Sequence, residues 1–226
     1  MADARAASIE RALVESLREL RCEPAGKLAF LALTRKSERH LCDLMAWRLQ
    51  RRVCSRALLV RCEKRLQRED ASVDIAVMRD GEPIALVEAK QGYTFDLARL
   101  VLGHSPTKNG IEADVRKDIE KQRCRQSICE RRYILLFFAH PRSVPPQGVL
   151  RDEYHSPLAK WVEKARAKGI PTPDWDRETL DRGFRRLSED LGGCLHPVCD
   201  GHSDFDAGDA FETNVRIFYW LLRVGG

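Results

Sequence analysis

Two carboxylates and a lysine on neighbouring apolar runs are the residues of this chain best suited to chemistry. Asp74 lies within the apolar run 72–78, and Glu88 and Lys90 lie at the end of the run 83–90. A carboxylate in such a run loses hydration, a cost that proteins accept mostly where a metal ion or a cationic partner compensates it. Two carboxylates beside a lysine indicate metal-assisted hydrolysis of a phosphodiester.

The turn between the two runs decides whether the carboxylates share a face of the sheet. A two-residue turn at 80–81 would send Glu88 to the face opposite Asp74. A three-residue loop at 80–82 would place Asp74 directly opposite Glu88, about 5 Å apart at Cβ. We therefore predict a three-residue or bulged turn. Lys90 then joins the same face, because side chains along a strand alternate with a period of two.

The aspartate and the Glu-x-Lys triplet resemble the motif of the PD-(D/E)xK nuclease superfamily. Asp74 matches the aspartate of that motif, Glu88-Ala89-Lys90 matches (D/E)xK, and Val73 stands in place of the usual proline. The predicted elements also follow a similar order. They are a helix at about 36–52, strands at about 56–63, 72–79 and 84–90, a helix at about 112–126 and a strand at 132–139.

The resemblance covers roughly residues 35–140 and implies a fold. That fold is an α/β restriction-endonuclease-like αβββαβ core, with a mixed central sheet flanked by helices. The implied activity is that of a Mg²⁺-dependent deoxyribonuclease acting in defence, repair or recombination. The sequence does not choose among these roles or between endonuclease and exonuclease action.

The resemblance also implies a metal site. Similar enzymes bind Mg²⁺ through the Asp and Glu carboxylates and through the carbonyl of the residue between Glu and Lys, and such hard oxygen ligands suit Mg²⁺ or Mn²⁺. Lys90 would orient the nucleophile or neutralise charge in the transition state. Glu38 matches a helix glutamate that joins the metal shell in similar nucleases, although an acid in a first helical turn also complements the helix dipole. The expected catalytic residues are Asp74, Glu88, Lys90 and Glu38, and the expected metal ligands are Asp74, Glu88, Ala89 and Glu38.

A surplus of basic residues flanks this site. Residues 35–68 hold eleven Arg or Lys and three Asp or Glu, whereas the whole chain holds 39 basic and 34 acidic residues. Such a segment could follow a phosphate backbone with salt-sensitive affinity, or it could be a solubilising surface. The charged residues of the helix at 112–126 share one face, which is most simply explained as solvated. The candidate DNA contacts are Arg48, Arg51, Arg52, Arg65, Arg68, Gln91, Lys117 and Lys121.

Two other interpretations stay open at this point. Asp74, Glu88 and Lys90 could form a structural ion pair at a sheet edge. The fold could also be a catalytically silent module that binds nucleic acid or a protein partner. Residues 200–212 hold five carboxylates and no Lys or Arg, which predicts a solvated loop or one that faces a basic partner. The sequence is compatible with a homodimer as well as with a monomer.

Length and patterning predict one nuclease-like domain over residues 1–226. The core of this domain is predicted to span residues 35–140, about the range that the resemblance covers. An amphipathic helix at 8–21 is expected to pack outside the core. The extension 141–226 should contain helices near 155–168 and 177–191 and a buried strand at 214–222 that extends the sheet.

Neither a membrane span nor a signal peptide is predicted, so we expect a cytoplasmic protein. In that compartment the eight cysteines should be reduced thiols. Cys42, Cys54 and Cys62 are interpreted as small core residues. Cys194, His196, Cys199 and His202 offer up to four zinc ligands, but their spacing is looser than that of a usual zinc knuckle.

Overall fold

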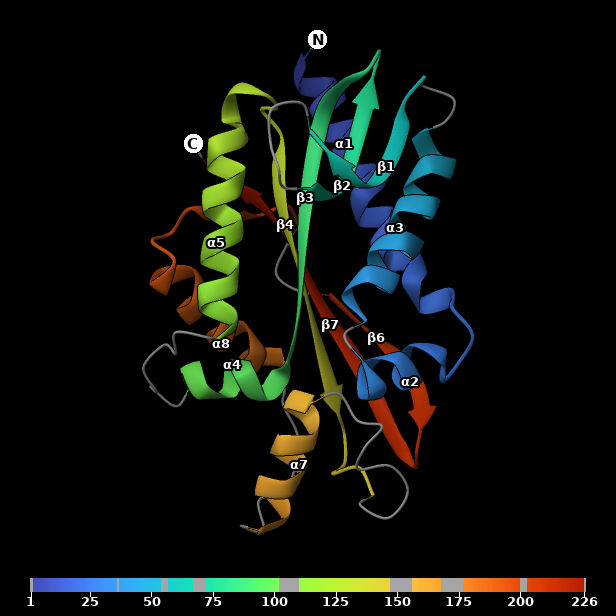
Figure 1. Ribbon diagram of the computed structural model, residues 1–226, viewed down its shortest axis with the longest axis vertical. Helices are drawn as coiled ribbons and strands as arrows, with labels where there is room; N and C mark the ends of the chain where they lie inside the picture. Colours follow the sequence, from blue (N-terminus) through green and yellow to red (C-terminus); the bar gives the residue numbers. More distant parts are fainter. Residues whose placement is uncertain are drawn as a thin grey trace.

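A mixed seven-stranded sheet forms the centre of the protein and has helices on both faces (Figure 1). The computed structural model describes residues 2–35, 37–53, 57–66, 72–101, 110–146, 156–167, 177–199 and 203–225. The strands are β1 (Leu59–Arg65), β2 (Ser72–Arg79), β3 (Glu82–Tyr93), β4 (Arg132–Pro141), β5 (Leu195–Pro197), β6 (Ser203–Ala210) and β7 (Thr213–Val224). The expected α/β class with a mixed, helix-flanked sheet is confirmed.

The strand order is β1-β2-β3-β4-β7-β5, and β6 also pairs with β7. Only the β3–β4 pair is parallel; the other paired strands of the described residues are antiparallel. A parallel pair requires a crossover connection, and here the connection contains α4 (Thr94–Val101) and α5 (Ile111–Cys124). Since α5 leads back to the start of β4, it runs antiparallel to β3.

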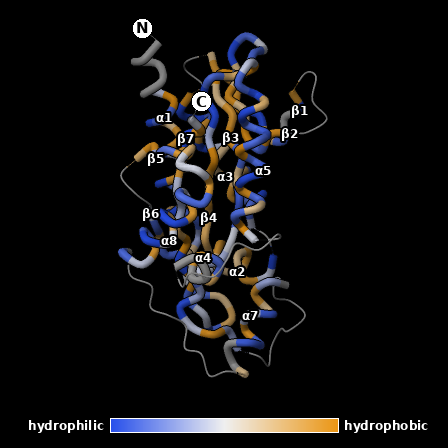
Figure 2. Tube along the Cα trace, turned by 90° about the vertical axis from the view of Figure 1, so that its left-hand side faces the viewer, coloured by the Kyte–Doolittle hydropathy of each residue, from blue (hydrophilic) through white to orange (hydrophobic). Residues whose placement is uncertain are grey.

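The other helices divide between the two faces of the sheet. α1 (Ala2–Arg18), α2 (Lys27–Thr34), α3 (Glu38–Val53) and α7 (Ser156–Ala167) contribute to the apolar cluster on one face. α4, α5 and α8 (Arg177–Asp190) contribute to the cluster on the other. The 3-10 helices η1 (Glu19–Cys22) and η3 (Arg125–Ser127) follow α1 and α5. Figure 2 shows apolar residues along the central strands and many hydrophilic residues on α5.

The N-terminal helix is part of the core, so the prediction that it packs outside the core was wrong. Ile9, Leu13, Leu17 and Leu20 are all buried in the same cluster as residues of α2, α3 and the sheet. These four residues recur at helical spacing and form one apolar face, which packs against α3. The periodicity of the sequence predicted the helix, whereas the structure shows which elements its apolar face packs against.

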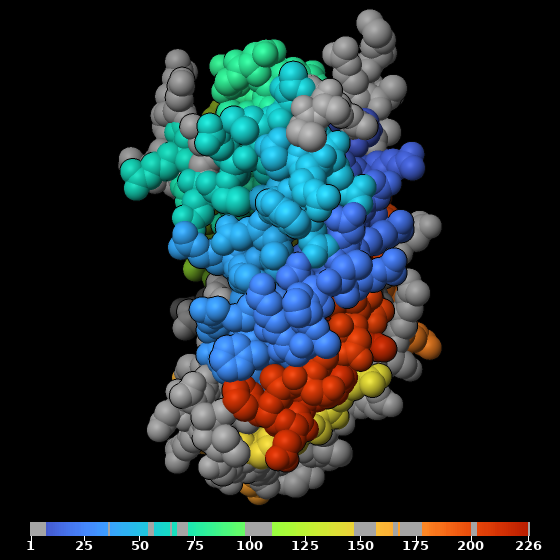
Figure 3. Space-filling view, turned by 90° about the vertical axis from the view of Figure 1, so that its right-hand side faces the viewer, coloured from blue at the N-terminus to red at the C-terminus, as the bar shows by residue number. Residues whose placement is uncertain are grey.

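The acidic segment is a strand, so the prediction of a loop at 200–212 was also wrong for the residues that the structure describes. β6 pairs with β7 and turns Phe205 and Ala207 into the core, while Asp204 and Asp206 face solvent. This alternation is the period-two signal of a half-buried strand, which the high acid content obscured. The expected buried strand at 214–222 is confirmed as β7. Figure 3 shows that α2, in blue, lies beside the C-terminal strands, in red.

Candidate active site

The β2–β3 hairpin sets the register of the site. Its turn consists of Asp80 and Gly81, both with positive φ (50° and 88°), and Arg79 pairs with Glu82. Positive φ at both central residues is typical of the two-residue hairpin turns that suit the twist of the strands. The turn is therefore shorter than a three-residue loop, which was one of the two arrangements that we expected; the other was a bulged turn.

A bulge inside the hairpin restores the predicted register. Met78 pairs with Pro83 but Val77 pairs with Ala85, which leaves Ile84 as an extra residue in β3. Beyond the bulge Ile75 pairs with Val87. The next positions along the two strands are Asp74 and Glu88, which thus lie opposite each other on the same face of the sheet. Lys90 follows on that face.

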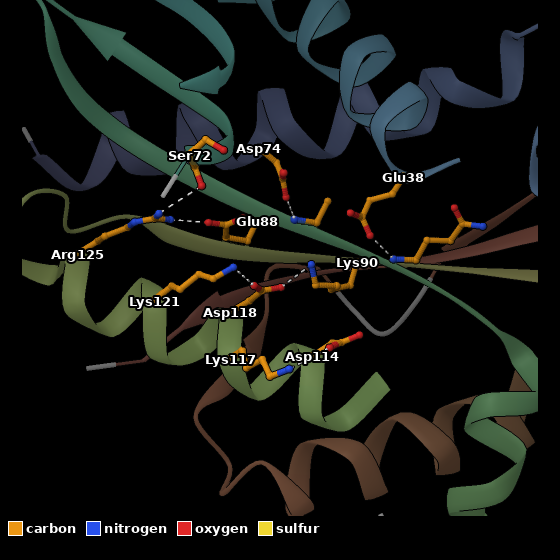
Figure 4. Close-up of polar contacts among 12 residues, drawn as sticks. Glu38, Ser72, Asp74, Glu88, Lys90, Asp114, Lys117, Asp118, Lys121 and Arg125 are labelled. Carbon is orange, nitrogen blue, oxygen red and sulfur yellow. Dashed lines mark hydrogen bonds and ion pairs between the residues drawn. The ribbon is translucent and has the colours of Figure 1, made fainter. Parts of the chain in front are cut away.

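After Val87, side-chain carboxylates accept the backbone hydrogen bonds of β3 in place of the β2 backbone. The Ala89 N–H donates to Asp74 Oδ2 at 2.7 Å, and the Gln91 N–H donates to Glu38 Oε2 at 2.9 Å (Figure 4). An amide at the side of a strand needs an acceptor, and here α3 and β2 supply one each. The N–H and the C=O of one strand residue point to the same side, so the Ala89 carbonyl faces the gap that Asp74 occupies.

Glu88 is buried and forms an ion pair with Arg125 of η3. Their side chains are 4% and 1% exposed, and Arg125 Nη1 lies 2.5 Å from Glu88 Oε1. The pKa of Glu88 is raised to about 7, chiefly by burial and then by the charge of Asp74, while the hydrogen bond and charge of Arg125 act in the opposite direction. A single guanidinium therefore does not balance the negative charge that Asp74 and Glu88 bring together.

Lys90 points toward α5, where it forms an ion pair with Asp118 (Figure 4). Lys90 Nζ lies 3.1 Å from Asp118 Oδ2, and Lys121 Nζ lies 2.8 Å from Asp118 Oδ1. Burial lowers the pKa of Lys90, but the carboxylates of Glu38, Asp118 and Asp74 raise it more, so the pKa lies above its usual value. Lys90 is thus an ammonium at neutral pH, a donor and a cation rather than a base.

Asp118 and Arg125 are the site residues that the sequence analysis missed. Asp118 was assigned to a solvated helix face, yet its side chain is 1% exposed. A signal was present in the sequence. An acid and a base seven residues apart lie on one face of a helix, and the strand before that helix carries an acid and a base two residues apart.

The described residues do not contain a group of three or more His, Cys, Asp and Glu side chains that could hold a metal ion. The nearest oxygen groups in the register are Asp74, Glu88 and the Ala89 carbonyl; Asp74 accepts from the Ala89 amide, and Glu38 accepts from the Gln91 amide. Hard oxygens of this kind fit Mg²⁺ or Mn²⁺ better than Zn²⁺. Of the four candidate zinc ligands, Cys194 donates to the Leu191 carbonyl and His202 lies outside the described residues.

The predicted DNA contacts have different surroundings. Arg48 is buried and pairs with Glu23, and the partly exposed Arg52 pairs with Glu15 of α1 and Glu19 of η1. Neighbouring acids therefore neutralise both side chains, and their contact with DNA stays a prediction. Arg51 lies over the exposed Trp47, 5.0 Å from its ring centroid, and Arg65 is exposed. Arg68 lies outside the described residues.

Gln91 and the two lysines of α5 complete that set. Gln91 Oε1 accepts from Ser37 Oγ at 2.8 Å, and its Nε2 is buried without a hydrogen-bond partner among the described residues. Its side chain therefore faces α3 and not solvent. Lys117 is exposed and pairs with Asp114, and Lys121 lies at the rim beside Asp118. Of these three residues, the two lysines are placed where a phosphate could reach them.

The core cysteine prediction holds for one residue. Cys42 is buried, whereas Cys62 is exposed because it lies on β1, the edge strand of the sheet. Cys54 lies outside the described residues. None of the described helices is long and apolar enough to cross a membrane. Comparison with models of known families, with curated proteins and with solved structures found no match for this chain.

Proposed function

We propose that this protein hydrolyses DNA phosphodiester bonds with a divalent metal ion, Mg²⁺ or Mn²⁺, on a restriction-endonuclease-like core formed by α3, β1, β2, β3, α5 and β4. One observation carries the proposal: the bulged β2–β3 hairpin sets Asp74 opposite Glu88, with Lys90 next on the same face. A single-residue change of register would have separated them.

The charges around the hairpin support a cation site. Four carboxylates, of Glu38, Asp74, Glu88 and Asp118, meet two buried or partly buried cations, Lys90 and Arg125, with Lys121 at the rim. Among the described residues the carboxylates outnumber these cations, and a divalent cation would neutralise the difference. Asp74, Glu88 and the Ala89 carbonyl are the groups that would hold it.

The chemistry divides between the metal and the side chains. A bound Mg²⁺ or Mn²⁺ would activate a water molecule and neutralise charge on the phosphate. Lys90 contributes a fixed positive charge where negative charge develops on the phosphate. Since its pKa is raised, Lys90 does not remove the proton of the attacking water. Lys117 and Lys121 extend the positive charge along α5 toward the DNA backbone.

A module that binds nucleic acid without cutting it is the second candidate. The observation in its favour is that Glu88 and Lys90 already have protein partners, Arg125 and Asp118. Buried pairs of this kind also occur as structural ion pairs.

Cleavage assays separate the two candidates. Linear, circular, single-stranded and branched DNA would be incubated with Mg²⁺ or Mn²⁺ and with wild type, Asp74→Ala, Lys90→Ala or the control Lys160→Ala, which alters an exposed lysine of α7. Cutting by wild type and the control alone supports the nuclease. Salt-sensitive binding by all four proteins without cutting would favour the binding module.

A further inference from the structure

The crossover topology places α5 against β3 in the opposite direction. A helix between two parallel strands must return to the start of the second strand, so its early residues lie beside late residues of the first strand. Asp118 precedes Arg125 on the helical segment, whereas Glu88 precedes Lys90 on β3. Because the directions are opposite, each acid meets a base: Arg125 pairs with Glu88, and Asp118 pairs with Lys90.

Arg125 restrains one oxygen of Glu88. Its Nη1 binds Oε1, and its Nη2 lies 3.4 Å from the Ser72 carbonyl at the start of β2. The guanidinium thereby connects η3 with both strands of the hairpin (Figure 4). Within the part of the chain that the structure describes, Arg125 binds Oε1, so Oε2 is the oxygen of Glu88 that would take a metal ion, held by a planar group with little freedom to move.

Asp118 restrains Lys90 in a similar way. Its carboxylate is almost fully buried and divides its oxygens between Lys90 and Lys121. A lysine has four rotatable bonds in its side chain, so an ammonium without such an anchor would sample many positions. The anchor holds the charge of Lys90 on the face shared with Asp74 and Glu88.

We propose that Arg125 and Asp118 are positioning residues of the nuclease site: Arg125 orients Glu88 for metal binding, and Asp118 orients Lys90 for turnover. This inference rests on the proposed function and deepens it. Neither residue touches the substrate, and each acts through the side chain that it holds. Partners of this type typically change metal affinity by about 10- to 100-fold when removed.

The proposed role of Arg125, the first arm of the proposal, is tested by measuring Mn²⁺ binding in the absence of DNA. Electron paramagnetic resonance reports the concentration of free Mn²⁺. Arg125→Met should raise the dissociation constant by about 10- to 100-fold, and Arg125→Lys should restore part of the affinity. The matched control Arg123→Met alters an exposed arginine two residues earlier and should bind like wild type. Should Arg125→Met fail to fold by circular dichroism, Arg125→Lys decides, with an expected loss of at least threefold. Wild-type affinity in the folded Arg125 variants would overturn this arm.

The Asp118 arm is tested by steady-state cleavage kinetics. Asp118→Asn should lower kcat at least tenfold while KM for DNA and the Mn²⁺ dissociation constant stay within twofold, and Asp118→Glu should recover part of kcat. A merely structural role would move all three constants together. The control Asp114→Asn changes a half-exposed acid one turn earlier and should leave them unchanged. An unchanged kcat in Asp118→Asn would overturn this arm.

The wild-type protein in the same experiments separates the two levels of the proposal. Wild type that binds Mn²⁺ and cleaves DNA, together with variants that behave like wild type, would refute the positioning roles and leave the nuclease standing. Wild type that neither binds Mn²⁺ nor cleaves any of the DNA substrates would refute the nuclease, and the positioning roles with it.

Discussion

The face of the sheet that α5 covers is charged over β3 and apolar over β4 and β7. Over β3 it presents Glu88 and Lys90, which meet ionic partners. Over β4 it presents Ile134, Leu136 and Phe138, which belong to an apolar cluster with Trp220 of β7. Neighbouring strands under one layer of helices thus have opposite kinds of interior.

The difference follows from how the backbone of each strand is satisfied. β4 is paired along its length, with β3 on one side and β7 on the other. The pairing of β3 with β2 ends at Ile75 and Val87, and the amides of Ala89 and Gln91 donate to the side chains of Asp74 and Glu38 instead. Where a central strand loses a strand neighbour, polar side chains must enter the interior to accept its N–H groups. The proposed metal ion and phosphate would approach this part of β3.

Lys90→Ala gives the largest expected effect and tests whether the charged region is built for chemistry. We expect kcat for DNA cleavage to fall at least about 10³-fold, because the transition state loses a fixed positive charge. Thermal unfolding should change little, since Asp118 keeps Lys121 as a partner. The measurement is single-turnover cleavage together with calorimetry. Cleavage that persists at the wild-type rate would remove Lys90 from the mechanism.

Phe138→Ala tests the apolar region by the opposite combination of effects. Phe138 is fully buried and packs edge-on against Trp220, with ring centroids 5.3 Å apart. Its truncation should lower the free energy of unfolding by about 3–5 kcal/mol through lost burial and a cavity. Urea unfolding measures this effect. The control is Phe30→Ala, at a 46% exposed position, which should lose little unfolding free energy. Equal losses at both positions would contradict the comparison.

Arg125→Met tests how far the charged region also contributes to stability. Removal of the buried guanidinium leaves Glu88 without its cation, which should cost about 3 kcal/mol of unfolding free energy. The double variant Glu88→Met with Arg125→Met should be more stable than Arg125→Met alone, because no buried charge remains. Urea unfolding of wild type, both single variants and the double variant gives the coupling energy. Additive losses would show that the two side chains do not interact.

The pH dependence of stability sharpens the same point with a smaller effect. In the folded protein the pKa of Glu88 is raised from 4.5 to about 7, chiefly by burial. A raised carboxyl pKa means that the folded state holds its proton more tightly, so stability decreases as pH rises from about 4.5 to about 7. We expect wild type to lose about 1–3 kcal/mol relative to Glu88→Gln across this range in metal-free buffer. Parallel urea-derived stability curves for the two proteins would contradict it.

Divalent metal gives the smallest expected effect. At ten times its dissociation constant, Mn²⁺ should raise the unfolding free energy of wild type by about 1.4 kcal/mol, because it binds only the folded state. Asp74→Ala should show no such increase, whereas Lys160→Ala should match wild type. Thermal unfolding with and without Mn²⁺ measures the effect. Stabilisation that survives Asp74→Ala would place the cation elsewhere.

Much of the fold could be predicted from local patterns. The apolar runs at 72–79 and 84–90 correspond to β2 and β3, and the helical patterns near 155–168 and 177–191 correspond to α7 and α8. These predictions succeeded because periodicity and turn residues act within a few positions of the chain. The acidic strand β6 was missed because its charge masked its alternation.

The shared face of Asp74 and Glu88 was predicted, but by a different device from the one that produces it. A shared face requires one extra residue between Asp74 and Glu88, and we predicted that residue in the turn. The structure places it at Ile84, inside β3, and keeps a two-residue turn. The sequence spacing alone does not fix the register, because residues 80–81 permit a two-residue turn. The bulge decides which face Glu88 takes, and its position depends on how the sheet twists and packs.

The sequence by itself determined which residues could do chemistry and that Glu88 and Lys90 share a face, because both follow from residue type and the period of a strand. The bulge at Ile84 brought Asp74 to that face. Only the tertiary structure decided what surrounds them. Asp118 and Arg125 are about 30 residues or more from their partners along the chain, and they meet β3 because a crossover helix must run back along the strand that it follows. Long-range pairing of this kind depends on the direction and packing of whole elements, which no local pattern records.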